Sequence, residues 1–159
     1  MTHVVEVTDA EARVALCRAV FADLPDWFGR PEATATYVSA VANLTTIAWE
    51  ADGETAGFAA LTRPTDKTCD IHVMGVLRRH HGQGGGRALI SACERHARAV
   101  GARFLTVQTV GPSAPDPHYE KTRAFYQACG MAALAEFPDH WGRGTPMLLM
   151  GKALQNGTC

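Results

Sequence analysis

Four glycines lie within the seven residues from His81 to Arg87, in the order His-Gly-Gln-Gly-Gly-Gly-Arg. Glycine loses more backbone freedom on folding than a residue with a side chain, so this composition is costly in an ordinary connection. Without side chains, the peptide N–H groups can approach a ligand closely. A helix is expected to begin at about Gly84, and its first turn would add unpaired N–H groups and a partial positive charge. The segment therefore predicts an anion site, most simply for a phosphate or diphosphate.

Two well-known phosphate-binding motifs do not fit this segment. A nucleotide-hydrolysing P-loop needs Gly-Lys-Ser/Thr, whereas here the glycines are followed by Arg87-Ala88-Leu89. A dinucleotide-binding fold needs Gly-x-Gly-x-x-Gly and an acidic residue about 20 residues further on. After Gly82-x-Gly84 the position of the third glycine is taken by Arg87, and the next expected strand, 103–109, contains no acid.

The glycine segment resembles the cofactor motif of the GNAT superfamily, the acetyl-CoA-dependent N-acetyltransferases. The signature Arg/Gln-x-x-Gly-x-Gly/Ala fits in two registers, which begin at Arg79 or at His81. We prefer the second register, because the family's final glycine is typically followed by Arg-Ala-Leu-Leu and the residues 87–90 here are Arg-Ala-Leu-Ile. In this register a histidine replaces the first arginine or glutamine.

Two further stretches strengthen the resemblance, which covers about residues 45–152. The segment 73–76 (Val-Met-Gly-Val) is similar to the family strand that separates from its neighbour at a bulge, and glycine favours a bulge. The segment 125–131 is similar to the second family signature, Phe-Tyr-x-x-x-Gly-Phe, with Met131 in the last position. The resemblance implies a GNAT (acyl-CoA N-acyltransferase) fold of the α/β class. We expect a mixed, mostly antiparallel twisted sheet with splayed central strands and flanking helices, in a single domain over residues 1–159.

The same resemblance implies that acetyl-CoA binds as the acyl donor. Its contacts are expected from the end of the strand before the loop, from the glycine segment, and from one face of the helix that carries the second signature, where residues at i, i+4 and i+7 coincide. The expected residues are Met74, Gly75, Val76, His81, Gly82, Gln83, Gly84, Gly85, Gly86, Arg87, Tyr119 and Arg123.

Transfer of an acyl group to an amine needs a base for the amine proton and an acid for the leaving thiolate. Tyr126 matches the tyrosine of the second signature, and a phenol with a pKa near 10 can donate to a thiolate. Tyr126 could equally pack in the core between helix and sheet. For the base, Asp70 is similar in position to a glutamate of histone-acetylating members, and His72 shares its strand face. A water molecule with backbone carbonyls is the third alternative.

The acceptor is expected to be an amine, either a small molecule or a peptide. Trp27 and Phe28 lie in the connection between the first two expected helices, which in the superfamily covers the acceptor site. They could form an apolar wall for the acceptor or simply hold the helices on the sheet. The other hypotheses are another acyl group or acceptor, or a sensor that binds acyl-CoA without turnover. A homodimer is compatible with the family.

Periodicity and turn residues predict the elements that position these groups. Helices are expected over about 8–22, opened by the capping box Thr-Asp-Ala-Glu at 8–11, and over 31–43 and 118–129, with a further long helix that begins at about Gly84 and ends before the strand at 103. Strands are expected over 45–51 and 55–61, joined by an Asp-Gly turn, and over 69–76, 103–109, 131–137 and 147–152. The proline-rich stretch 111–117 is expected to be a loop.

Composition limits the function classes. Hydrophobic residues make up 47% of the 159 residues and the net charge is −1, which gives no electrostatic reason to bind nucleic acid or an anionic membrane. No apolar run approaches 18 residues, so we expect a cytoplasmic protein without a membrane segment. The five cysteines are far apart and the seven histidines show no ligand spacing, so neither a disulfide framework nor a metal site is expected.

Overall fold

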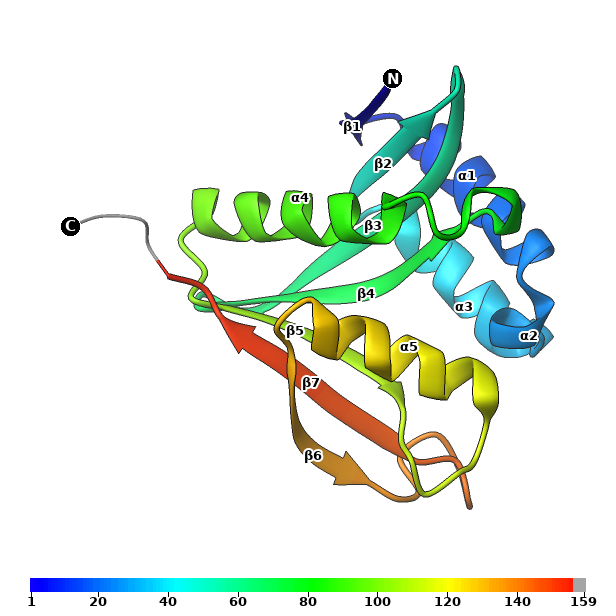
Figure 1. Cartoon of the computed structure of the whole chain (residues 1–159), viewed down its shortest axis with the longest axis vertical. Coiled ribbons are helices and arrows are strands. Elements are labelled where there is room, and N and C mark those ends of the chain that lie inside the picture. Colours follow the sequence, from blue (N-terminus) through cyan, green and yellow to red (C-terminus); the bar gives the residue numbers. More distant parts are fainter. Residues whose placement is uncertain (156–159) are drawn as a thin grey trace. The chain divides into compact units, whose positions relative to one another are not determined.

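The computed structural model describes residues 1–155 as a mixed seven-stranded sheet with flanking helices (Figure 1). The strand order is β1-β2-β3-β4-β5-β7-β6. This architecture confirms the predicted fold class. The elements are β1 (Thr2–Val7), α1 (Ala10–Asp23), α2 (Pro25–Phe28), α3 (Pro31–Val41), β2 (Thr45–Ala51), β3 (Glu54–Thr65), β4 (Thr68–Val76), the 3-10 helix η1 (Arg78–His80), α4 (Gly85–Ala99), β5 (Phe104–Val110), α5 (Pro117–Ala128), β6 (Ala132–Phe137) and β7 (Met147–Ala153).

The contacts divide the chain into two compact units. The first unit contains residues 1–62 and 71–96, and the second contains residues 63–70 together with the chain from Ala97 onward. The single domain expected over 1–159 stays a prediction.

In the first unit, β2 and β3 form the expected hairpin. Its turn residues Asp52 and Gly53 have φ values of 53° and 80°, which is the left-handed conformation that an Asp-Gly turn favours. The edge strand β1 pairs antiparallel with β2 and was not predicted. Its apolar side chains are only half-buried, so the sequence of residues 2–7 does not show the pattern of a core strand. The backbone hydrogen bonds of β1 come from β2, which lies about 40 residues later in the chain.

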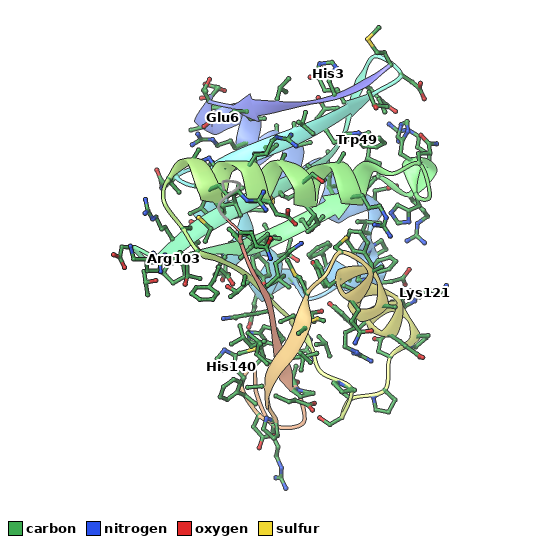
Figure 2. All side chains as sticks on the ribbon, turned by 60° about the vertical axis from the view of Figure 1, so that its left-hand side comes forward. His3, Glu6, Trp49, Arg103, Lys121 and His140 are labelled. Atoms are coloured by element: carbon green, nitrogen blue, oxygen red, sulfur yellow. The ribbon has the colours of Figure 1, made fainter. Side chains whose placement is uncertain are left out.

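Alternation along the hairpin sends large side chains to opposite faces of the sheet. Trp49 lies opposite Gly57 and Phe58 lies opposite Ala48, so Trp49 and Phe58 point to different sides. The Phe58 face packs against buried residues of α1 and α3, including Val20 and Phe21. The Trp49 face contacts the beginning of α4 (Figure 2).

Two local predictions for the first unit were wrong in detail. The N-cap of α1 is Asp9, whose carboxylate accepts a hydrogen bond from Ala12 N at 2.8 Å, rather than Thr8. A carboxylate is as good a cap as a hydroxyl and also interacts favourably with the helix dipole. The expected connection around Trp27 and Phe28 is the one-turn helix α2, which Pro25 begins.

In the second unit, β7 lies between β5 and β6 and pairs antiparallel with both. Leu105, Val107 and Met150 are buried there, as is Tyr126 of α5. The expected loop after β5 is tied to β6, since the Glu136 carboxylate accepts hydrogen bonds from Ser113 N at 3.1 Å and Ser113 Oγ at 2.6 Å.

Among residues 1–155, Cys17, Cys69, Cys93 and Cys129 form no disulfide, and Cys159 lies outside the described residues. Burial raises the pKa of Cys17 to about 11, as expected for an unreactive core thiol. Within residues 1–155, no helix is both long and apolar enough to cross a membrane.

Candidate functional site

The glycine segment forms an open turn at the N-terminus of α4, which begins at Gly85. Gly82 and Gly84 have φ values of 79° and 86°, in the region that side chains disfavour, and a Cβ atom at either position would meet nothing within 4 Å. The turn is exposed from His81 to Gly84. Glycine is therefore required here by backbone conformation, and the space above the turn is open.

The backbone N–H groups of this turn are available to a ligand. Ala88 N is bonded to Gly84 O at 3.0 Å, which is the first hydrogen bond of the helix. Within residues 1–155, the N–H groups of residues 84–87 donate no hydrogen bond. The unpaired groups and the partial positive charge of a 15-residue helix act together at this point. Such an arrangement is able to bind an anion.

Close packing of Gly85 against Trp49 of β2 holds the turn in place. Gly85 is buried, and a Cβ atom on it would lie 2.5 Å from the Trp49 ring. The His80 ring meets the same indole edge-on, with a centroid distance of 6.0 Å. Gly85 is thus needed for close packing, whereas Gly82 and Gly84 are needed for backbone conformation.

Glu54, the first residue of β3, holds the start of the turn. Its carboxylate accepts a hydrogen bond from Nε of Arg79 at 2.9 Å and lies 2.6 Å from Nε2 of the buried His80. The other ring nitrogen of His80 lies 3.1 Å from Gln83 Oε1, and the Gln83 amide is oriented by its own bond to Arg79 O. Both ring nitrogens of His80 therefore face acceptors, which is the arrangement of an imidazolium.

These contacts displace two pKa values in opposite directions. The hydrogen bond from Arg79, and then that from His80, lowers the pKa of Glu54 to about 2. The hydrogen bonds to Glu54 and Gln83 raise the pKa of His80 above its usual 6.5. Both shifts favour the charged forms of Glu54 and His80, at the base of the glycine turn.

A pH dependence of stability follows from these shifts. The contribution of Glu54 is present above its ordinary pKa of 4.5 and is lost as the pH falls toward 2. The contribution of His80 is present below pH 6.5 and is lost as the pH rises through its raised pKa. We expect the free energy of unfolding to be higher for the wild type than for Glu54→Gln, and the difference to be largest between about pH 4.5 and 6.5. Urea unfolding of both proteins from pH 3 to 9 checks this, and a pH-independent difference would contradict it.

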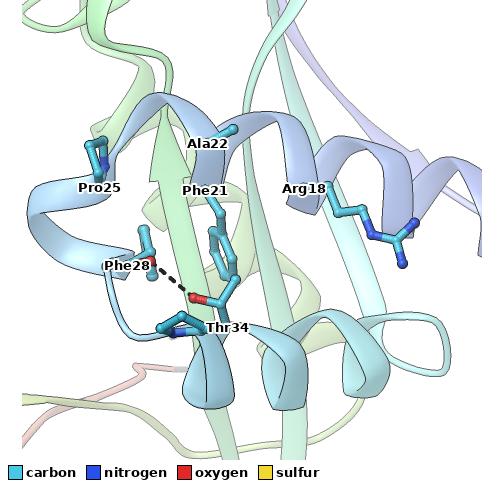
Figure 3. A pocket seen from close by; sticks show the side chains of 8 residues that line it. Arg18, Phe21, Ala22, Pro25, Phe28 and Thr34 are labelled. Carbon is cyan, nitrogen blue, oxygen red and sulfur yellow. Dashed lines mark hydrogen bonds between the residues drawn. The ribbon is translucent and has the colours of Figure 1, made fainter.

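The predicted acceptor residues Trp27 and Phe28 are neighbours on α2 but contact different partners. Phe28 stacks on Phe21 at a centroid distance of 4.0 Å and lines a hollow of about 340 Å³ between α1, α2 and α3 (Figure 3). Thr34 closes one side of the hollow and donates a hydrogen bond to Phe28 O at 3.0 Å. Trp27 instead meets the glycine turn, with 6.3 Å between the centroids of its ring and that of His81.

The end of β4 lies in the same unit as the glycine turn. Met74, Gly75 and Val76 are half-buried, and Val76 O lies 2.7 Å from His81 Nε2. A Cβ atom on Gly75 would lie 2.7 Å from Val20 Cγ1, so close packing of α1 accounts for this glycine, and the expected bulge stays a prediction. His72 packs its ring against Tyr37 at 5.1 Å, and its Nε2 is shielded from solvent.

The remaining predicted site residues belong to the second unit. Asp70 accepts a hydrogen bond from Thr106 Oγ1 at 2.6 Å. Tyr126 is buried, with 6% of its surface exposed, and its ring contacts that of Phe125 at 5.4 Å. The half-buried Arg123 donates to Val110 O at 2.7 Å, which ties α5 to the end of β5.

Tyr119 is half-buried on the same helix as Arg123. The roles predicted for these residues and for those of the first unit stay predictions.

Sequence reasoning missed the residues that hold the glycine turn in place. Glu54 looks like an ordinary exposed residue after a turn, and Trp49 looks like an ordinary core residue. Their partners lie 25 to 36 positions later in the chain, and no local pattern connects them. The glycines themselves were the available signal, since a buried Gly85 implies that a large neighbour packs closely against it.

Comparisons with known proteins identify the family and the fold. The family model described as the acetyltransferase (GNAT) family matches residues 13–131. Among curated proteins, no sequence relative matches the chain. Many solved structures are similar.

One of these is a GNAT-family structure from Desulfovibrio desulfuricans, with 21% sequence identity and a TM-score of 0.84, covering 98% of this chain and 100% of that chain. Another is an aminoglycoside 6'-N-acetyltransferase complexed with coenzyme A, with 16% identity and a TM-score of 0.73, covering 99% of each chain.

A third is a GNAT acetyltransferase from Elizabethkingia anophelis with acetyl-CoA bound, with 16% identity and a TM-score of 0.72, covering 96% of this chain and 98% of that chain. At such identities these structures establish the fold alone. The family model, by contrast, covers well over half of the sequence, including the glycine turn and the second signature. The chain therefore belongs to the GNAT family of acetyltransferases, which are acyltransferases.

Proposed function

We propose that this protein transfers an acetyl group from acetyl-CoA to a primary amine, by direct attack within a ternary complex. The observation that carries the proposal is the set of backbone N–H groups at residues 84–87, which make no hydrogen bond within residues 1–155 and adjoin the open space at Gly82 and Gly84. A diphosphate supplies the charge and the oxygen atoms that such groups bind. Two of the similar structures hold coenzyme A or acetyl-CoA, which supports the same donor here.

The reaction sets two demands on the chain. A lysine-like amine has a pKa of about 10.4, so roughly one molecule in 2,500 is neutral at pH 7, which adds about 4.6 kcal/mol to the barrier. A base that accepts the amine proton removes part of this cost. The amine nitrogen then forms a bond to the acetyl carbonyl carbon while the carbon–sulfur bond breaks, and the sulfur keeps the electron pair. An acid that protonates this thiolate completes the transfer.

Three side chains and a water molecule are the candidates for these proton transfers. We assign the acid to Tyr126, whose phenol holds its proton at neutral pH and can give it to the thiolate. His72 and Asp70 are the alternative bases, with a bound water molecule as the third. Asp70 is already held by Thr106, so its carboxylate has a defined orientation. The predicted acceptor is a small-molecule or peptide amine, and a homodimer remains compatible with the family.

Calorimetry with coenzyme A and with pantetheine tests the anion site. Pantetheine has the same thiol arm but lacks the diphosphate, so we expect it to bind at least about 100-fold more weakly, corresponding to about 2.7 kcal/mol. Equal affinities, or no binding of coenzyme A, would overturn the proposal. Thiol release from acetyl-CoA against a panel of amines then tests the chemistry. Binding without thiol release for any amine would favour the sensor hypothesis over the enzyme.

A further inference from the structure

The side chain of Trp27 lies between two residues that flank the glycine turn. The guanidinium carbon of Arg78 is 5.9 Å from the centroid of the indole, and the His81 ring meets it edge-on at 6.3 Å. His81 is the first residue of the preferred motif register, and Arg78 lies three positions before it. Helix α2, which carries Trp27, is therefore in direct contact with the proposed cofactor site.

Arg78 is the main connection between the turn and α2. Its backbone N–H donates to Asp23 Oδ2 at 2.6 Å, at the end of α1. Its guanidinium donates to Asp26 Oδ2 at 3.1 Å, on α2, and to Asp23 O at 3.4 Å. With the contact to Trp27, one side chain thus binds α2 through a carboxylate and an aromatic face, a combination that suits arginine and not lysine.

The neighbouring Arg79 provides an internal comparison. It is exposed to a similar degree, with 58% of its side chain accessible against 50% for Arg78. Its guanidinium is bound by Glu54 of β3. Two adjacent arginines therefore attach the same turn to different elements, and of the two, Arg78 is the one with described contacts to α2.

We propose that Arg78 is a positioning residue that couples occupancy of the anion site to the placement of α2, and hence of the acceptor wall formed by Trp27 and Phe28. An anion bound to the N–H groups of residues 84–87 restricts the glycine turn, which begins at His81. Restricting His81 and Arg78 restricts Trp27, because all three are in contact. The inference rests on the proposed function, since it requires coenzyme A to bind at this turn.

Hydrogen exchange of two amides reports the coupling directly. Trp27 N and Phe28 N are bonded to Leu24 O at 3.2 and 3.0 Å, so their exchange measures local opening of α2. In the wild type, we expect saturating coenzyme A to slow their exchange by about fivefold, the lower end of typical coupling, because the connecting contacts are half-exposed. In Arg78→Ala the slowing should fall below about twofold, and Arg78→Lys should restore only part of it.

Arg79→Ala is the matched control, because it removes the neighbouring guanidinium without touching α2. At saturating coenzyme A, we expect it to keep the wild-type slowing at Trp27 and Phe28. For any amine that is turned over, Arg78→Ala should also raise the KM for the amine more than the dissociation constant for coenzyme A. A merely structural role would lower stability and leave the ratio of exchange with and without coenzyme A unchanged.

The outcomes separate this inference from the function on which it rests. If calorimetry shows no binding of coenzyme A to the wild type, the proposed function fails. If coenzyme A binds and exchange at Trp27 and Phe28 does not change, the function stands and the coupling is wrong. The coupling is also wrong if coenzyme A slows exchange at Trp27 and Phe28 in Arg78→Ala as much as in the wild type. It is equally wrong if Arg79→Ala loses this slowing to the same extent as Arg78→Ala.

Discussion

Gly84→Asp should weaken the binding of coenzyme A by on the order of 100-fold. Gly84 is exposed at the centre of the turn, and the space above it is open, so an aspartate there would place its carboxylate in the anion site. Two unit charges about 5 Å apart near a protein surface repel each other by about 3 kcal/mol. Calorimetry with coenzyme A measures the loss directly. Higher salt should reduce it, since salt screens exposed charges.

Gly84→Asn is the control for backbone strain. Asparagine has the shape of aspartate without its charge, and both tolerate a positive φ better than other residues, so the two variants share the cost of a φ of 86°. We expect Gly84→Asn to lose less than about 10-fold in affinity, corresponding to about 1.4 kcal/mol. Equal losses in the two variants would show that backbone conformation rather than charge determines binding. That result would contradict the proposal that this turn binds an anion.

Tyr126→Phe should lower turnover by about 100-fold or more, the range of a lost general acid, while the affinity for coenzyme A stays within a few-fold. The substitution removes the proton that we assign to the leaving thiolate and keeps the ring that packs beside Phe125. Thiol release at saturating acetyl-CoA measures turnover with any amine that the panel identifies. Near-wild-type turnover would exclude Tyr126 from the mechanism and leave it as a core residue.

Tyr119→Phe is the control that distinguishes the loss of any tyrosine hydroxyl near the cofactor from the loss of the general acid. Tyr119 lies on the same helix and is predicted to contact the cofactor, so its hydroxyl can affect binding without affecting the chemical step. We expect it to change the KM for acetyl-CoA and to leave the turnover number within a few-fold of the wild type. Thermal unfolding of both variants is needed beside the kinetics, because Tyr126 is only 6% exposed and a substitution at a buried position can change stability.

Local sequence determined most of the elements. The Asp-Gly turn placed the β2–β3 hairpin, and the glycine turn with its following helix was recognisable because residues 82–86 leave little alternative to an open backbone at a helix N-terminus. The second family signature likewise placed α5 and its terminating Gly130. These features depend on neighbours in the chain, and periodicity and glycine content report such neighbours directly.

Only the tertiary structure decided what holds the turn in place. Glu54 binds Arg79 and His80 across about 25 residues of sequence. The ring of Trp49 leaves no room for a side chain at Gly85. Strand β1 exists because β2 offers it a partner, and Arg78 reaches α2 across about 50 residues. Each of these contacts is a long-range pairing between residues of ordinary type. A sequence shows residue types and local spacing, whereas partners are chosen only when the sheet brings distant segments together.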